Sequence, residues 1–159
     1  MYLPVRVQGL FVDPISERPI LVLRHEGGER VLPIWIGPNE AHAIAVRLEG
    51  VEAPRPMTHD LLQGVVEGLG ASLVKVLICD LRDNTYYARL VLEAGGRETT
   101  VDARPSDAVA LAVRVGAPIL VREDIFAHSS DETLGREGEE ALRQWLESLG
   151  PDEFGRYEM

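Results

Sequence analysis

The sequence is poor in several residue types whose absence limits what the protein can be. Among its 159 residues there is one cysteine, Cys79, few aromatic side chains (6%) and no uninterrupted apolar run of about 18 residues. One cysteine excludes an internal disulfide and a structural zinc site built from several cysteines. The absence of a long apolar run and of a charged, apolar leader predicts a cytoplasmic protein that does not cross a membrane.

Positive charge is also in short supply. There are 16 lysines and arginines against 26 acidic residues, which gives a net charge of -10. Residues 131 to 159 hold nine acids and three arginines and so supply -6 of this charge. Because affinity for nucleic acid comes mainly from positive charge, a broadly basic binding surface is excluded. A nucleic-acid contact would require a local arginine patch or a bound metal ion.

The length and the 45% apolar content suit one compact core, and the pattern of apolar and turn residues predicts its elements. We expect strands at 2 to 12, 20 to 25, 30 to 36, 72 to 81, 85 to 93, 97 to 103 and 118 to 122, and helices at 39 to 48, 58 to 69 and 106 to 115. The predicted fold is therefore α+β. It consists of two related β-β-β-α units with largely antiparallel mixed sheets and an intervening helix.

The two predicted units are related in sequence. When residues 38 to 48 are aligned with residues 105 to 115, six of the eleven positions are identical. The segments before them, LVLRHEGGER (21 to 30) and LVLEAGGRE (90 to 98), are also similar. A similarity that recurs after about 67 residues indicates an internal duplication.

The composition changes after Ser130, where the chain becomes polar and acidic. Leu142, Trp145, Leu146 and Leu149 recur at helical spacing and predict an amphipathic C-terminal helix. We therefore divide the chain into a domain at 1 to 130 and an acidic helix and tail at 131 to 159. An apolar stripe needs a partner, which is either the domain itself or another subunit.

Four carboxylates lie at strand ends or in the first turns of helices: Glu40, Asp60, Asp102 and Asp107. Oxygen ligands of this kind suit Mg²⁺ or Mn²⁺, and carboxylate-held metals activate water in phosphodiester cleavage. The alternative is structural, because an acidic residue in the first turn complements the helix dipole.

Two arginines, Arg55 and Arg104, each precede a proline and a helix start. There they would bind phosphate beside free backbone N–H groups, with Thr58 and Ser106 as further substrate contacts. These two hydroxyl residues are also the expected N-caps of their helices. An ion pair between Arg104 and Asp102 or Asp107 is the structural alternative for this arginine.

His59 is the histidine best placed for proton transfer, because Thr58 and Asp60 flank it at a helix start. The alternative is an ordinary histidine in a first turn. No phosphate-binding glycine loop, nucleophile elbow or dinucleotide fingerprint occurs in the sequence. A nucleotide cofactor is therefore not expected.

Three motifs together resemble the bifunctional nuclease domain family over about residues 1 to 130. They are Trp35-Ile36-Gly37 with Glu40-Ala41, Arg55-Pro56-Met57-Thr58-His59-Asp60, and Asp102-Ala103-Arg104-Pro105-Ser106-Asp107-Ala108. The resemblance implies an α/β domain, commonly dimeric, for which cleavage of DNA and RNA has been ascribed to some members.

These observations favour a nuclease that hydrolyses DNA and RNA with little sequence preference and depends on a divalent metal. His59, Asp102 and Asp107 are its expected catalytic residues, nucleic acid its expected partner and a homodimer its expected assembly. The alternative is a non-enzymatic module that binds an anion or a protein partner. The acidic charge balance and the lack of an unambiguous catalytic signature favour that second hypothesis.

Overall fold

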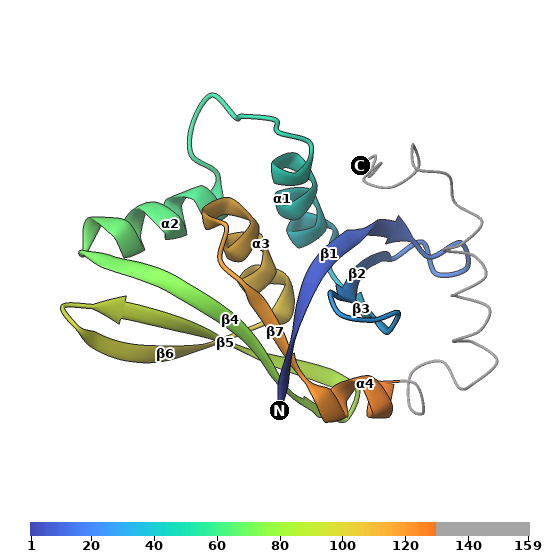
Figure 1. Cartoon of the computed structure of the whole chain (residues 1–159). Coiled ribbons are helices and arrows are strands. Elements are labelled where there is room, and N and C mark those ends of the chain that lie inside the picture. Colours follow the sequence, from blue (N-terminus) through green and yellow to red (C-terminus); the bar gives the residue numbers. More distant parts are fainter. Residues whose placement is uncertain (130–159) are drawn as a thin grey trace.

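The structure is a computed structural model and describes residues 1–129 (Figure 1). Its strands are β1 (Tyr2–Val12), β2 (Pro19–His25), β3 (Val31–Trp35), β4 (Ala71–Arg82), β5 (Thr85–Ala94), β6 (Arg97–Ala103) and β7 (Ile119–Arg122). Its helices are α1 (Pro38–Leu48), α2 (Thr58–Gly68), α3 (Pro105–Val115) and α4 (Glu123–Ser129). The order of elements confirms the predicted α+β fold with two β-β-β-α units and a helix between them.

All seven strands belong to one sheet, in the order β3-β2-β1-β7-β4-β5-β6. β7 pairs antiparallel with β1 and parallel with β4, and every other pairing is antiparallel. β7 lies at the centre of the sheet. The three strands of the first predicted unit lie on one side of it, and the three strands of the second unit lie on the other side. The sequence predicted the two units but not that β7 joins them into a single sheet.

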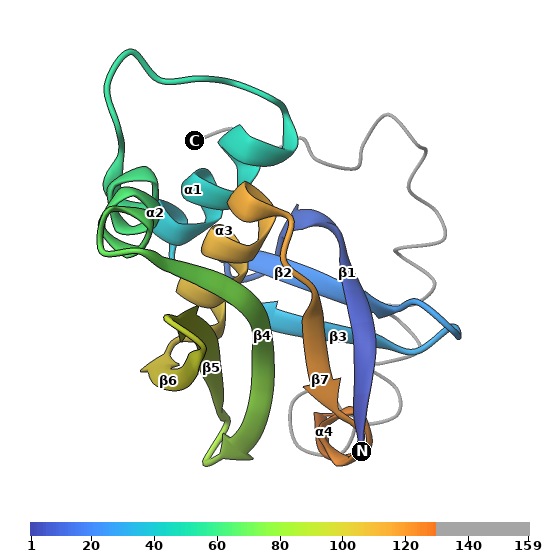
Figure 2. The same cartoon turned by 60° about the vertical axis from the view of Figure 1, so that its left-hand side comes forward.

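Three helices lie together on one side of this sheet, and α3 contacts both α1 and α2 (Figures 1 and 2). α3 is buried almost all round, with Ala108, Val109 and Ala110 fully inaccessible to solvent. α1 buries Ala41 and Ile44 against the same core. Because alanine is small, the helices approach closely, and this brings residues at their ends together.

In two of the three long helices, α2 and α3, the N-cap residue differs from the prediction. Ser106 is not an N-cap, because α3 begins at Pro105 and Arg104 occupies the cap position. Proline has no N–H to lose and a suitable φ, so it fits the first helical position and leaves the serine buried in the first turn. Thr58 is likewise the first helical residue and not the cap. The carboxylate of Asp60 accepts the hydrogen bond from the backbone N–H of Met57 (2.9 Å) instead.

The far end of the fold contains one element that the sequence did not predict. Gly116 ends α3 in the left-handed conformation (φ 73°), as its position suggested, and β7 follows. The short helix α4 was missed, because seven residues give too little periodicity to identify a helix.

The predicted helix at 142 to 149 lies outside the described residues. None of the helices in residues 1–129 has the length and apolar character needed to span a bilayer.

Candidate active site at three helix starts

The first turns of α1, α2 and α3 meet through a chain of polar contacts. Each of these helices has a carboxylate at its third position: Glu40, Asp60 and Asp107. Arg104 donates to Glu40 (Nη2 to Oε1, 2.7 Å) and to Asp107 (Nε to Oδ2, 2.9 Å). Asp107 also contacts His59 (Oδ1 to Nε2, 2.8 Å). The four side chains therefore form a continuous network, Glu40–Arg104–Asp107–His59.

His59 is the most enclosed member of this network, with 9% of its side chain exposed. The carboxylate of Asp107 favours the tautomer with a proton on Nε2, because a carboxylate accepts and does not donate. The other ring nitrogen, Nδ1, has no hydrogen-bond partner among residues 1–129. Asp107 thus orients the ring and leaves Nδ1 available as a proton acceptor.

Arg104 is the exposed member, with 65% of its side chain accessible against 17% for Glu40. The hydrogen bond to Glu40, followed by that to Asp107, raises the pKa of the guanidinium. Its Nε and Nη2 bind the carboxylates, so the N–H groups of Nη1 remain free of described partners. The sequence left two roles open for Arg104, phosphate binding and an ion pair with Asp102 or Asp107. The ion pair with Asp107 is confirmed.

A second arginine, Arg114, joins the three helices from within. Its side chain is 3% exposed and its Nε donates to Oδ1 of Asp60 (2.8 Å). Its Nη1 donates to the carbonyl oxygens of Ala43 in α1 (3.0 Å) and Ala110 in α3 (2.9 Å). The hydrogen bond from the N–H of Met57, with that from Arg114, lowers the pKa of Asp60. Asp60 and Arg114 therefore fix α2 against α3 and so hold His59 in place.

Sequence reasoning missed Arg114, although a signal was present. It is the charged residue in the apolar run Ala108 to Val115, on a helix whose pattern predicts burial all round. A charge in such a place must be paired or hydrogen-bonded. A positive charge in the last turn also complements the helix dipole, so its position alone did not single out this arginine.

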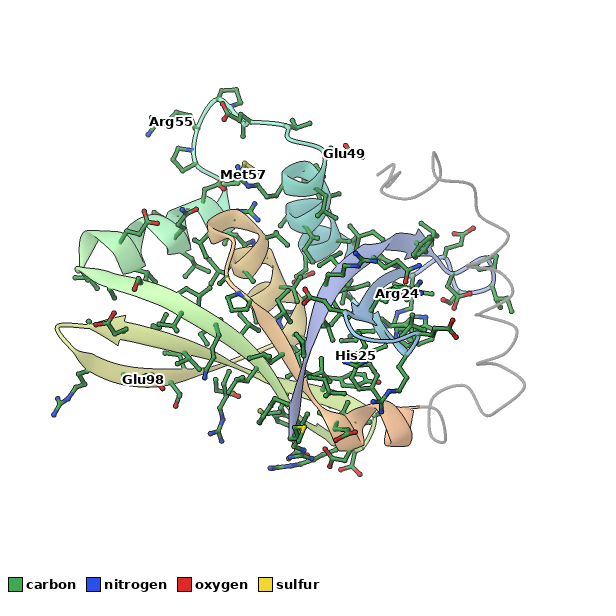
Figure 3. All side chains as sticks on the ribbon, in the orientation of Figure 1. Arg24, His25, Glu49, Arg55, Met57 and Glu98 are labelled. Atoms are coloured by element: carbon green, nitrogen blue, oxygen red, sulfur yellow. The ribbon has the colours of Figure 1, made fainter. Side chains whose placement is uncertain are left out.

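Beside the network lies a cavity of about 880 Å³. The helix starts supply its polar wall, and the connector between α1 and α2 covers it from the other side. Its apolar lining residues include Val46 on α1 and Val51, Pro54 and Met57 from the connector, which also contributes the charged Glu52 and Arg55. In Figure 3 the connector arches over the helices.

The structure brings most of the predicted site residues to this cavity. Those that line it are Glu40, Arg55, Thr58, His59, Asp60, Arg104 and Asp107. Two predicted residues do not line it: Ser106 is buried inside α3, and Asp102 is an exposed residue of β6 paired in register with Arg89. Arg55 lies at the outer end of the connector and points away from the helices (Figure 3). The roles expected for these residues remain predictions.

The four predicted metal ligands are not arranged as a ligand set. Within residues 1–129 there is no group of three or more His, Cys, Asp or Glu side chains placed to hold a metal ion. Asp60 is bound to Arg114, while Glu40 and Asp107 share Arg104. As arranged, these residues do not fit Mg²⁺ or Mn²⁺, so no step of the proposed reaction uses a metal ion. The requirement for a divalent ion remains a prediction from the sequence.

The family model of the bifunctional nuclease domain matches residues 21–133, so the chain belongs to that family. The matched region contains every residue of the polar network. The resemblance drawn from the three motifs is therefore confirmed.

Similar proteins are found in bacteria and plants. An uncharacterized protein of Mycobacterium tuberculosis is 47% identical over 94% of this chain and 96% of its own length. Bifunctional nuclease 2 of Oryza sativa subsp. japonica is 30% identical over 74% of this chain, and Bifunctional nuclease 1 of Arabidopsis thaliana is 28% identical over 73%. The matches cover 38% and 37% of the two plant proteins.

Proposed function

We propose that this chain is a nuclease that hydrolyses phosphodiester bonds of DNA and RNA with little sequence preference. The observation that carries the proposal is the enclosed His59, which Asp107 holds through one ring nitrogen while the other is free, next to the exposed Arg104. An oriented imidazole can take a proton from an attacking water, and a nearby cation can offset the charge that develops on a phosphate. Family membership and the names of the plant relatives support the same chemistry.

The proposed reaction uses these three side chains. Nδ1 of His59 takes a proton from a water whose oxygen forms a bond to phosphorus. Arg104 offsets the charge that builds on the phosphoryl oxygens through Nη1, which makes no contact with the carboxylates. Asp107 stabilises the imidazolium. The bond from phosphorus to the leaving oxygen breaks on the opposite face, where that oxygen takes a proton from solvent, and His59 then releases its own proton to solvent, so protons and charge balance.

The proposal includes nucleic acid as the partner, a homodimer as the assembly and the cytoplasm as the location. Support for a subunit interface comes from α2, where Leu61 is 60% exposed and Val65 is 50% exposed. An apolar helix face of this kind is costly to leave in water. Sedimentation of the purified chain would test the dimer, and fractionation of cells would test the location.

The direct test compares His59→Gln with His25→Gln, a histidine outside the cavity (Figure 3). Labelled single-stranded DNA and RNA are incubated with each protein in Mg²⁺, in Mn²⁺ and in chelator. We expect His59→Gln to lose about 100-fold or more in rate, the usual contribution of a positioned acid or base, and His25→Gln to keep the parental rate. Cleavage that survives both His59→Gln and Asp107→Asn would refute the assignment of this site. The chelator arm tests the metal requirement.

A second candidate is a non-enzymatic module that binds an anion or a protein partner at the same cavity. It is favoured by the two carboxylates that already neutralise Arg104 and by the lack of an assembled metal ligand set in residues 1–129. Binding of labelled oligonucleotide without cleavage under any of the ionic conditions above would support this candidate over the nuclease.

A further inference from the structure

The cavity combines two chemically different walls. The exposed Arg104 and the enclosed His59 suit a phosphate. The apolar side chains of Val46, Val51, Pro54 and Met57 also line the cavity and form its apolar wall. Such a pairing matches a single nucleotide unit, whose phosphate is charged and whose base has flat apolar faces.

The dimensions of the cavity limit the form of nucleic acid that enters it. Its lining residues on α1 run from Asn39 to Arg47, which is roughly 12 Å of helix at 1.5 Å per residue. The volume of about 880 Å³ is in the range of small-molecule sites, and the connector covers one side. His59 lies inside, with 7% of the residue exposed. A base-paired nucleotide is held in its stack, so its base and phosphate cannot enter a space of this size together.

On the basis of the proposed nuclease function, we infer that the site acts on unpaired nucleotides and excludes the duplex. The phosphate binds Arg104, and the adjacent base and sugar pack against the apolar wall of Val46, Val51, Pro54 and Met57. Enzymes whose pockets take in a base act on single strands or unstack the target nucleotide first. Among residues 1–129, no Phe, Tyr or Trp lines this cavity, so base stacking contributes little to binding.

The test uses one labelled strand in three forms: single-stranded, in a blunt duplex, and in a duplex with a central unpaired loop. We expect the single strand to be cleaved at least about tenfold faster than the blunt duplex, and the looped duplex to be cut in the loop. Equal rates on the single strand and the blunt duplex would overturn the inference and leave the nuclease intact. If no form is cleaved, the proposed function fails, and the inference is decided by fluorescence anisotropy with the same three forms. Duplex binding as tight as single-strand binding would then overturn it.

A pair of variants tests the apolar wall itself. Val51→Asp places a charge in the wall, at a residue 56% exposed, and Ile15→Asp places the same charge in a distant turn, at a residue 94% exposed. We expect Val51→Asp to weaken single-strand binding about fivefold or more at fixed salt, and Ile15→Asp to leave it unchanged. Because both variants add one negative charge, a general electrostatic effect would weaken both equally and would refute a role for this wall.

Discussion

The starts of α1 and α3 are related in sequence but differ in what they do. In α3 the cap position is Arg104, and the carboxylate of Asp107 faces both this arginine and His59. In α1 the corresponding cap position is Gly37, and the carboxylate of Glu40 folds back over it. From there Glu40 reaches Arg104 of the other unit. One unit therefore carries the reactive groups, and the other supplies a counter-charge.

The difference shows how a duplicated scaffold becomes a single site. A side chain at position 37 would occupy the space that Glu40 now fills, so glycine there permits the contact between units. The intervening α2, which has no counterpart after α3 in the described chain, adds His59. Neither copy has the whole network alone, and substitutions at matched positions in the two units test this division.

The largest expected effect comes from the two matched carboxylates. Asp107→Asn should lower the cleavage rate by about 10²- to 10⁴-fold. The amide of asparagine neither fixes the tautomer of His59 that has its proton on Nε2 nor stabilises the positive charge of the imidazolium. Glu40→Gln should cost about tenfold or less, since the only side chain within residues 1–129 that Glu40 binds is that of Arg104. Single-turnover rates on single-stranded DNA measure both. Equal losses would contradict the division of roles between the two units.

The next effect compares the two arginines at equivalent positions near the helix ends. Arg114→Met removes three hydrogen bonds from a side chain 3% exposed, and should lower the free energy of unfolding by about 2 to 4 kcal/mol. Arg47 is exposed and makes one long hydrogen bond, to the carbonyl of Arg114 (3.3 Å), so Arg47→Met should cost under about 1 kcal/mol. Urea denaturation measures the difference, and a larger loss in Arg47→Met would be inconsistent with the contacts described.

A smaller effect depends on pH. Hydrogen bonds hold the pKa of Asp60 below its usual 3.8, so its ionised form contributes stability that is present above that value. This contribution is lost as the pH falls through the lowered pKa. Asp60→Asn should therefore cost about 1 kcal/mol near pH 7, after allowance for exposure, and flatten the loss of stability below about pH 4.

The control for this pH profile is Asp83→Asn, in an exposed turn with a left-handed backbone that asparagine accepts (φ 49°). Denaturation curves between about pH 2 and pH 7 are recorded for both variants. An unchanged acid profile in Asp60→Asn would argue against the contact with Arg114.

The smallest effect tests the space beside the α1 start. Gly37 has an ordinary φ of -76°, so Gly37→Ala imposes no backbone strain, but the added methyl group displaces the flexible carboxylate of Glu40. We expect a change in stability under about 1 kcal/mol. The double-mutant cycle of Glu40→Gln with Arg104→Gln is measured with and without Gly37→Ala. The coupling between Glu40 and Arg104 should weaken when Gly37→Ala is present, and an undiminished coupling would show that Glu40 has another route to the arginine.

Local patterns predicted most of the fold and part of the site. Alternation and turn residues predicted the strands to within a residue or two, and the helix starts predicted at 58 and 106 placed His59 and Asp107 correctly in first turns, although α3 begins at Pro105. Pairings between distant segments were not predictable, because no local pattern says that β7 lies between β1 and β4. For the same reason Asp102 was grouped with Asp107, five residues away, although a strand end and the first turn of the following helix direct their side chains differently.

The central position of β7 has a consequence for how the protein is made. β7 is four residues long and is the last strand described, yet it joins both halves of the sheet. Until it is synthesised, β1 and β4 each have an open edge, and open edges pair readily with other chains. A fragment that stops before Ile119 would therefore be prone to aggregation. Although the units are duplicated, neither half should survive as an independent domain.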